Sequence, residues 1–227
     1  MPPRFFSYSG LWIHLIYSLV VIISCFLIYF KTKELYELTS HKGIKYFRNT
    51  FLFFGITHIA RLFLHVIRAL RINPLIAIPS DFGIFETTFF FMVYASSMAF
   101  IYLLYSIFWK KIDRYPSSNV YVFHIFALII AFLSILEKIP LLFLVFQGGL
   151  FFLLIIVSLY HYKETRHREA FSQVYLIYLL IFALSIISNI LEFIAYFSPN
   201  LGLVIYALSV VLFLIVLFKV LRKVSSR

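Results

Sequence analysis

Seven apolar stretches dominate this sequence, and each is long enough to cross a membrane as a helix. They cover residues 11–30, 50–70, 82–109, 120–136, 141–160, 172–197 and 201–221. A hydrocarbon core about 30 Å thick takes about 20 apolar residues at the helical rise. Of the 227 residues, 63% are hydrophobic and 13% are charged, and a soluble domain of this size has too little interior to hide so much apolar surface. The sequence therefore predicts an all-α, polytopic membrane protein with seven transmembrane helices.

The basic residues predict which side of the membrane each loop faces. If the loop after the first stretch is cytoplasmic, 15 of the 20 lysines and arginines fall on the inner side and four on the outer side. Because cytoplasmic loops carry an excess of positive charge, we expect the N-terminus outside and the C-terminus inside the cell membrane. The loops are short, so residues 1–227 should form a single transmembrane domain. We interpret the net charge of +11 as inner loops that meet anionic lipid or a signalling partner, and not nucleic acid.

The first three stretches and the last three show an internal similarity. Placing residue 47 over residue 171 pairs three polar positions of the second stretch with three of the sixth: Arg61 with Ser185, His65 with Asn189, and Arg68 with Glu192. We therefore predict a parallel 3+1+3 repeat, with residues 11–109 and 141–221 as the triplets and 120–136 as the linker. This plan is similar to that of seven-helix sugar transporters and receptors in architecture alone, and architecture does not fix function.

A stripe of basic and ionisable side chains interrupts the second stretch. Its members are His58, Arg61, His65 and Arg68, which fall within an arc of about 80° on a helix. Arg61 lies about 13 Å from the outer end of its span at the helical rise. Exposure to lipid at that depth would cost from about 3 kcal/mol to well above 10. We therefore expect Arg61 to face the bundle interior, with Glu86 and Glu192 as the available carboxylate partners.

The predicted functional site is a polar pocket in the outer half of the bundle. Its candidate residues are His14, His58, Arg61, His65, Arg68, Glu86, Tyr94, Asn189, Glu192 and Tyr206. Intramembrane ionisable residues are candidate sites by default, and the excess of cationic groups predicts a polar or anionic ligand. The alternative interpretation is a hydrogen-bonded network that only fixes helix packing.

These features favour a sensor-like or ligand-binding membrane protein that signals through a partner. A small-solute transporter that rocks its two triplets is the second possibility, although the nearly apolar inner halves of the last two stretches favour a pocket closed at its inner end. A haem-binding redox subunit and a purely structural membrane component are further alternatives. We predict no cofactor and no enzymatic activity, because the sequence contains neither a nucleophile elbow nor an HExxH motif.

Two smaller interpretations concern single residue types. The one cysteine, Cys25, falls within the first stretch and is expected to be a small packing residue. Tyr102, Tyr105 and Trp109 near the end of the third stretch are expected to form part of an interfacial aromatic belt.

Overall fold

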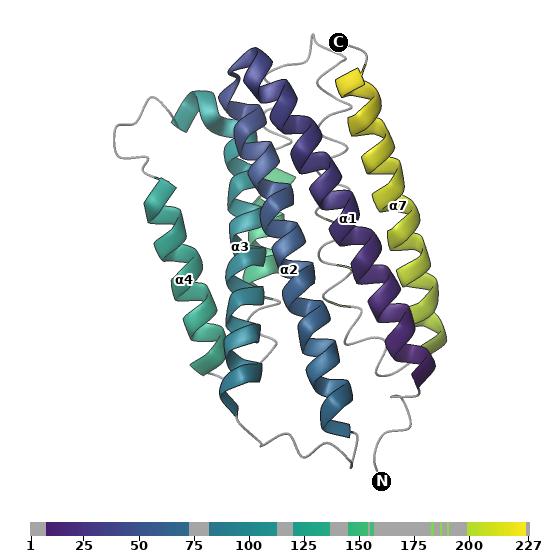
Figure 1. Cartoon of the computed structure of the whole chain (residues 1–227). Helices are drawn as coiled ribbons and strands as arrows, with labels where there is room; N and C mark the ends of the chain where they lie inside the picture. The colour runs from purple at the N-terminus through teal and green to yellow at the C-terminus, as the bar shows by residue number, and fades with distance from the viewer. Residues whose placement is uncertain are drawn as a thin grey trace.

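The described part of the chain is helical apart from a turn at Ser40 and His41. The structure, a computed structural model, describes residues 8–72, 82–112, 120–136, 145–153, 155–156, 183, 187, 190 and 199–225. Five helices have defined bounds: α1 (Tyr8–Thr39), α2 (Lys42–Ile72), α3 (Phe82–Ile112), α4 (Val120–Leu136) and α7 (Pro199–Ser225). They lie side by side, with α1 between α2 and α7, and α3 between α2 and α4 (Figure 1).

Four of these helices are long and apolar enough to cross a membrane. Their candidate spans are His14–Thr39, Lys42–Ile67, Gly83–Ile107 and Val204–Arg222, and a shorter apolar helix covers Tyr121–Leu136. These helices coincide with five of the seven predicted stretches. The predicted stretches 141–160 and 172–197 lie largely outside the described residues, apart from a helical segment at 145–153. The helices thus suggest a membrane protein.

The exterior of the bundle is apolar, unlike that of a soluble protein. Large apolar side chains cover the outward faces; in α4, for example, Ile125 and Phe132 are 57% and 58% exposed. Buried hydroxyls instead bond to their own helix, as when Thr57 donates to the carbonyl of Phe53 at 2.9 Å and Ser134 to that of Ile130 at 2.8 Å. An apolar exterior matches lipid, while a hydroxyl inside it needs a partner within the protein.

The connection between α1 and α2 is shorter than the sequence predicts. The spans were expected to end at residue 30 and to resume at residue 50, whereas both helices continue and leave a turn at Ser40 and His41. Two exposed ion pairs accompany the extension of α1: Lys31 with Glu34 at 3.4 Å, and Lys33 with Glu37 at 3.7 Å. Ser40 then takes a left-handed conformation with φ of 49° and donates its amide to the carbonyl of Tyr36 at 2.8 Å. This bond caps α1, because a left-handed residue after a helix satisfies one of its last carbonyls.

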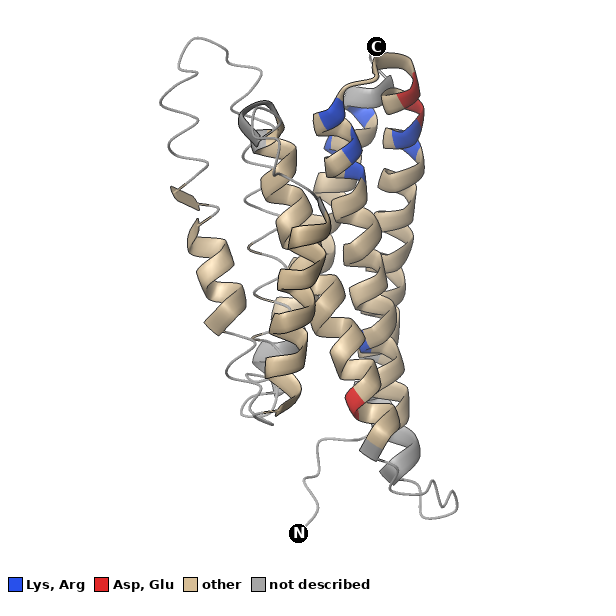
Figure 2. Ribbon diagram, turned by 90° about the vertical axis from the view of Figure 1, so that its left-hand side faces the viewer, with Lys and Arg blue, Asp and Glu red and all other residues tan. Residues whose placement is uncertain are grey.

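Lysine and arginine residues gather at one end of the bundle, which we call the basic end (Figure 2). There α1 and α7 end and α2 begins, and the described cations are Lys31, Lys33, Lys42, Lys45, Arg48, Lys219 and Arg222. The first turn of α1 lies at the opposite end of the bundle from the last turn of α7 (Figure 1). Among the described helices, α1, α3 and α7 run toward the basic end, and α2 and α4 run away from it (Figure 1).

Helices α1 and α2 approach closely where Gly55 faces Cys25. A Cβ atom at position 55 would lie 3.4 Å from the Cβ of Cys25 and 3.7 Å from the ring of Phe26. Cys25 is fully buried, in agreement with its predicted packing role. Small residues allow transmembrane helices to approach closely, so that dispersion contacts hold them together.

We expect Gly55→Leu to lower the melting temperature in mild detergent, because a leucine cannot fit against Cys25 without moving α1. Overpacking of this kind costs about 1–3 kcal/mol. Gly83→Leu is the matched control, since a Cβ at position 83 meets nothing within 4 Å. Equal melting temperatures for the two variants would contradict the close approach of α1 and α2 at Gly55.

Candidate functional site: a buried polar cluster between α1, α2 and α7

The basic stripe of α2 lies inside the bundle. His58, Arg61 and His65 are 1%, 4% and 6% exposed. Burial of these three side chains confirms the prediction that the stripe faces the interior. Arg68 belongs to α2 as well, but its side chain lies outside the described part of the structure.

Aromatic rings from three helices meet beside this stripe. His14 of α1 stacks on His65, with centroids 4.4 Å apart and planes 24° apart, and meets Tyr206 of α7 edge-on at 4.9 Å. One turn further along α1, Tyr17 contacts Tyr206 at 4.9 Å and His58 at 5.7 Å. Helical spacing adds Ser18, Arg61 and Ser209, and we call the whole set the polar cluster: His14, Tyr17, Ser18, His58, Arg61, His65, Tyr206 and Ser209.

Three buried atoms of the polar cluster have no hydrogen-bond partner among the described residues. They are Nδ1 of His58 and the hydroxyl oxygens of Ser18 and Ser209. Their residues are 1%, 1% and 0% exposed. A buried polar group without a hydrogen bond costs about 1–3 kcal/mol, so native proteins rarely leave one. These atoms call for a partner, which water, a small ligand or another part of the chain could supply.

An apolar layer closes the polar cluster toward the basic end. We call this layer the apolar floor: Val21, Cys25 and Ile28 of α1, Phe51 and Phe54 of α2, and Phe213 and Val216 of α7, none of them more than 4% exposed. Phe54 joins the two regions, since its ring lies 5.1 Å from that of His58 and 5.6 Å from that of Phe213. The rings and charged groups of the polar cluster therefore give way to mainly apolar side chains toward the basic end, although Ser24 and Thr50 are also buried there.

A second polar contact joins α3 to α4. His124 of α4 bridges two tyrosines of α3, with Nδ1 2.7 Å from the hydroxyl of Tyr94 and Nε2 3.3 Å from that of Tyr102. A neutral imidazole has one donor and one acceptor nitrogen, so it can serve both hydroxyls. The candidate pocket residue Tyr94 thus lies against α4, apart from the polar cluster. Phe53 packs on this side, 5.3 Å from the ring of Tyr102 and 6.2 Å from that of His124.

The prediction of an interfacial aromatic belt is wrong for two of its three residues. Tyr102 and Tyr105 are only 7% and 4% exposed, and both pack against Tyr46 of α2. The reason is the central position of α3, whose candidate span is the most buried of the four. These two tyrosines face neighbouring helices, and of the three predicted belt residues only Trp109, beside His41 at the basic end, is partly exposed.

The two carboxylates that the sequence predicts as partners of Arg61 are not seen beside it in the described part of the structure. Glu86 is partly buried on α3 and forms no hydrogen bond or ion pair with any described residue. Asn189 and Glu192 lie outside the described part, so the pairing of Arg61 with a carboxylate stays a prediction. Across the described residues, no three His, Cys, Asp or Glu side chains are grouped so that they could hold a metal ion.

Three members of the polar cluster, Tyr17, Ser18 and Ser209, were not among the predicted site residues. For Tyr17 and Ser18, the available signal was their spacing of three and four residues from His14, which puts these three residues on one face of a helix. Sequence reasoning also missed the contact between Gln147 and Ser96, both buried, in which the amide of the 145–153 segment donates to the hydroxyl on α3. No sequence pattern links two residues so far apart.

The chain is similar over nearly its whole length to an archaeal protein. That protein, an uncharacterized protein of Archaeoglobus fulgidus, is 32% identical over 224 residues, which cover 98% of this chain and 97% of the relative. The chain belongs to the family of this archaeal protein. No family model matches the chain, and no solved structure matches it.

We expect Tyr94→Phe and His124→Phe to be coupled, because each removes one end of the 2.7 Å hydrogen bond that ties α4 to α3. Such interhelical bonds are worth about 0.6 kcal/mol on average and up to about 1.7. The measurement is a double-mutant cycle on the free energy of unfolding in mixed micelles. Tyr121→Phe on α4, where the side chain is 73% exposed, should show no coupling to His124→Phe. Equal coupling for both tyrosines would refute the specific role of Tyr94.

Proposed function

We propose that this protein is a sensor-like or ligand-binding component of the cell membrane, which holds a small polar or anionic ligand in the polar cluster. Three buried polar atoms, on Ser18, His58 and Ser209, have no described hydrogen-bond partner, and they lie in one cluster with a buried arginine. A ligand with several oxygen atoms would satisfy such a group of atoms together. This observation carries the proposal.

The described members of the polar cluster favour an anionic ligand. Arg61 offers only donors, and serine, tyrosine and neutral histidine each offer at least one. No described carboxylate joins the cluster. Carboxylate or phosphate oxygens make the strongest hydrogen bonds with such a set, because one partner in each bond to Arg61 is fully charged.

The apolar floor supports binding in preference to transport. A transporter needs a route for its solute to the second face of the membrane, and desolvating a polar solute against fully buried residues such as Phe51 and Phe213 would be costly. Pocket occupancy that changes how α1, α2 and α7 pack would give a sensor its signal. The basic end, where anionic lipid also gathers, is then the surface for a signalling partner.

The proposal includes seven spans in a 3+1+3 parallel repeat, with the N-terminus outside. Helix α1 begins and α7 ends at opposite ends of the bundle, which supports an odd number of spans, and the basic end, which holds the last turn of α7, supports the orientation. Helix α4 ends and α7 begins at the same end of the bundle (Figure 1). The intervening residues 137–198 are numerous enough for two further spans of about 20 residues each.

This topology predicts the side from which engineered cysteines react. In a Cys25→Ala background, Ser40→Cys in the turn at the basic end should react with a membrane-impermeant maleimide only after cells are permeabilised. Gly83→Cys, at the start of α3 near the opposite end, should react in intact cells. Both positions are exposed, so access to the reagent is the only difference tested. The reverse pattern would place the basic end outside and contradict the proposed orientation.

Native mass spectrometry of the protein in mild detergent tests the ligand itself. We expect a discrete extra mass on the wild type and its loss in Arg61→Ala. Lys45→Ala, an exposed position on the same helix, should keep the extra mass.

Two smaller substitutions keep the test independent of folding. Ser18→Ala and Ser209→Ala each remove a hydroxyl without a described partner. If no ligand is bound, they should leave stability unchanged or raise it slightly, since an unpaired buried hydroxyl is unfavourable. If the ligand uses these hydroxyls, both variants should retain it several-fold less well. Bare protein in every sample would leave the polar cluster as a packing network and overturn the proposal.

A further inference from the structure

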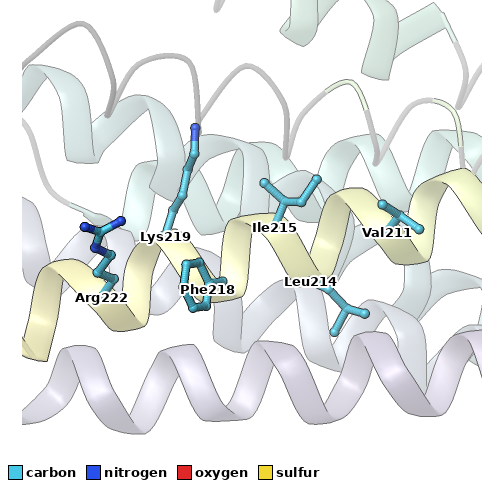
Figure 3. Close-up of a pocket in the computed structure, with 6 residues that line it drawn as sticks. All are labelled: Val211, Leu214, Ile215, Phe218, Lys219 and Arg222. Atoms are coloured by element: carbon cyan, nitrogen blue, oxygen red, sulfur yellow. The ribbon is translucent and has the colours of Figure 1, made fainter.

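The outward face of α7 carries a hollow near the basic end. Its volume is about 430 Å³, and its lining residues are Val211, Leu214, Ile215, Phe218, Lys219 and Arg222 (Figure 3). They form two neighbouring rows along the helix, since residues four positions apart lie one above the other. Each row has two apolar side chains followed by one cation, so the hollow changes from apolar to cationic along its length.

The change from apolar to cationic falls where a membrane changes from hydrocarbon to headgroups. The candidate span of α7 runs from Val204 to Arg222, so Arg222 is its last residue and Lys219 lies one turn earlier. From Val211 to Arg222 the helix rises about 16 Å, which matches one leaflet of a hydrocarbon core about 30 Å thick. The four apolar side chains are 41–66% exposed and would face acyl chains.

Lys219 and Arg222 differ from most cations at the basic end in the contacts that their charged groups make. On α1, Lys31 and Lys33 each pair with a glutamate, and on α2 the guanidinium of Arg48 lies over the rings of Tyr29 and Tyr36, at 5.1 and 5.5 Å. By contrast, Lys219 and Arg222 form no ion pair or hydrogen bond with any described residue. Helix α7 contains no acidic residue that could neutralise them.

We infer that this hollow binds an anionic phospholipid, with its phosphate between Lys219 and Arg222 and an acyl chain along Val211, Leu214, Ile215 and Phe218. A free phosphate ion would use only the cations and leave the apolar rows without a role. A zwitterionic lipid would bring an ammonium group next to two positive charges. The anionic phospholipid alone matches both parts of the hollow. This site lies on a different face and at a different depth from the polar cluster, so it does not depend on the proposed function.

Lipid titration of the delipidated full chain, followed by native mass spectrometry, tests the charge of the site. Phosphatidylglycerol should bind the wild type more tightly than phosphatidylcholine with the same acyl chains. Lys219→Gln/Arg222→Gln should weaken phosphatidylglycerol binding about thirtyfold, since each cation near a membrane contributes about a fivefold gain. Lys31→Gln/Lys33→Gln removes the same charge at the same end and should change the affinity less than twofold. Equal losses in the two double variants would reduce the site to general attraction and overturn the inference.

A second set of variants tests the shape of the hollow and leaves its charge unchanged. Ile215→Trp fills the hollow and should lower phosphatidylglycerol binding several-fold, whereas Val204→Trp, an exposed position elsewhere on α7, should not. Inorganic phosphate at millimolar concentration should not displace the lipid. Displacement by phosphate, equal binding of phosphatidylcholine, or indifference to Ile215→Trp would each overturn the inference. Because the altered side chains are exposed, an unchanged melting temperature can confirm that every variant is folded.

Discussion

The cost of a guanidinium group in hydrocarbon constrains how the described helices can pack. Arg61 lies inside the candidate span Lys42–Ile67, where lipid can neither solvate its charge nor accept its hydrogen bonds. Helix α2 must therefore turn this side chain inward and surround it with other polar groups, and α1 and α7 supply rings and hydroxyls on that side. The burial of the stripe, the contact of three helices and the position of the candidate site all follow from this constraint.

The same physical rule explains which parts of the fold can be predicted from sequence. Span length is fixed by the membrane, so the described helices lie where the apolar stretches predict them, and α4 has the predicted bounds. The ends of α1 and α2 are different, because water does not limit a helix to the membrane thickness. Two ion pairs accompany the polar extension of α1 toward Ser40, and a hydropathy pattern does not register such local contacts.

Lateral packing is harder to predict, and the tyrosines show why. In a soluble protein an apolar face marks the core, but in lipid both the inner and outer faces of a helix are apolar. Tyr102 and Tyr105 therefore resemble interfacial residues in sequence, although α2 and α4 cover them. Tyr94 and Tyr206 are both predicted pocket residues but contact different histidines, His124 and His14. The charged stripe escapes this ambiguity, because only the bundle interior can hold it.

Two adjacent phenylalanines of α2 connect the polar cluster with the contact between His124 and the tyrosines of α3. Phe54 lies against His58 and the apolar floor, while Phe53 lies against the rings of Tyr102 and His124. Both rings are fixed to one rigid helix, so neither can move far without carrying the other. A rotation of α2 about its axis would loosen or tighten its packing against α7 and α4 together. A change in packing on one side of α2 would therefore alter the packing on its other side.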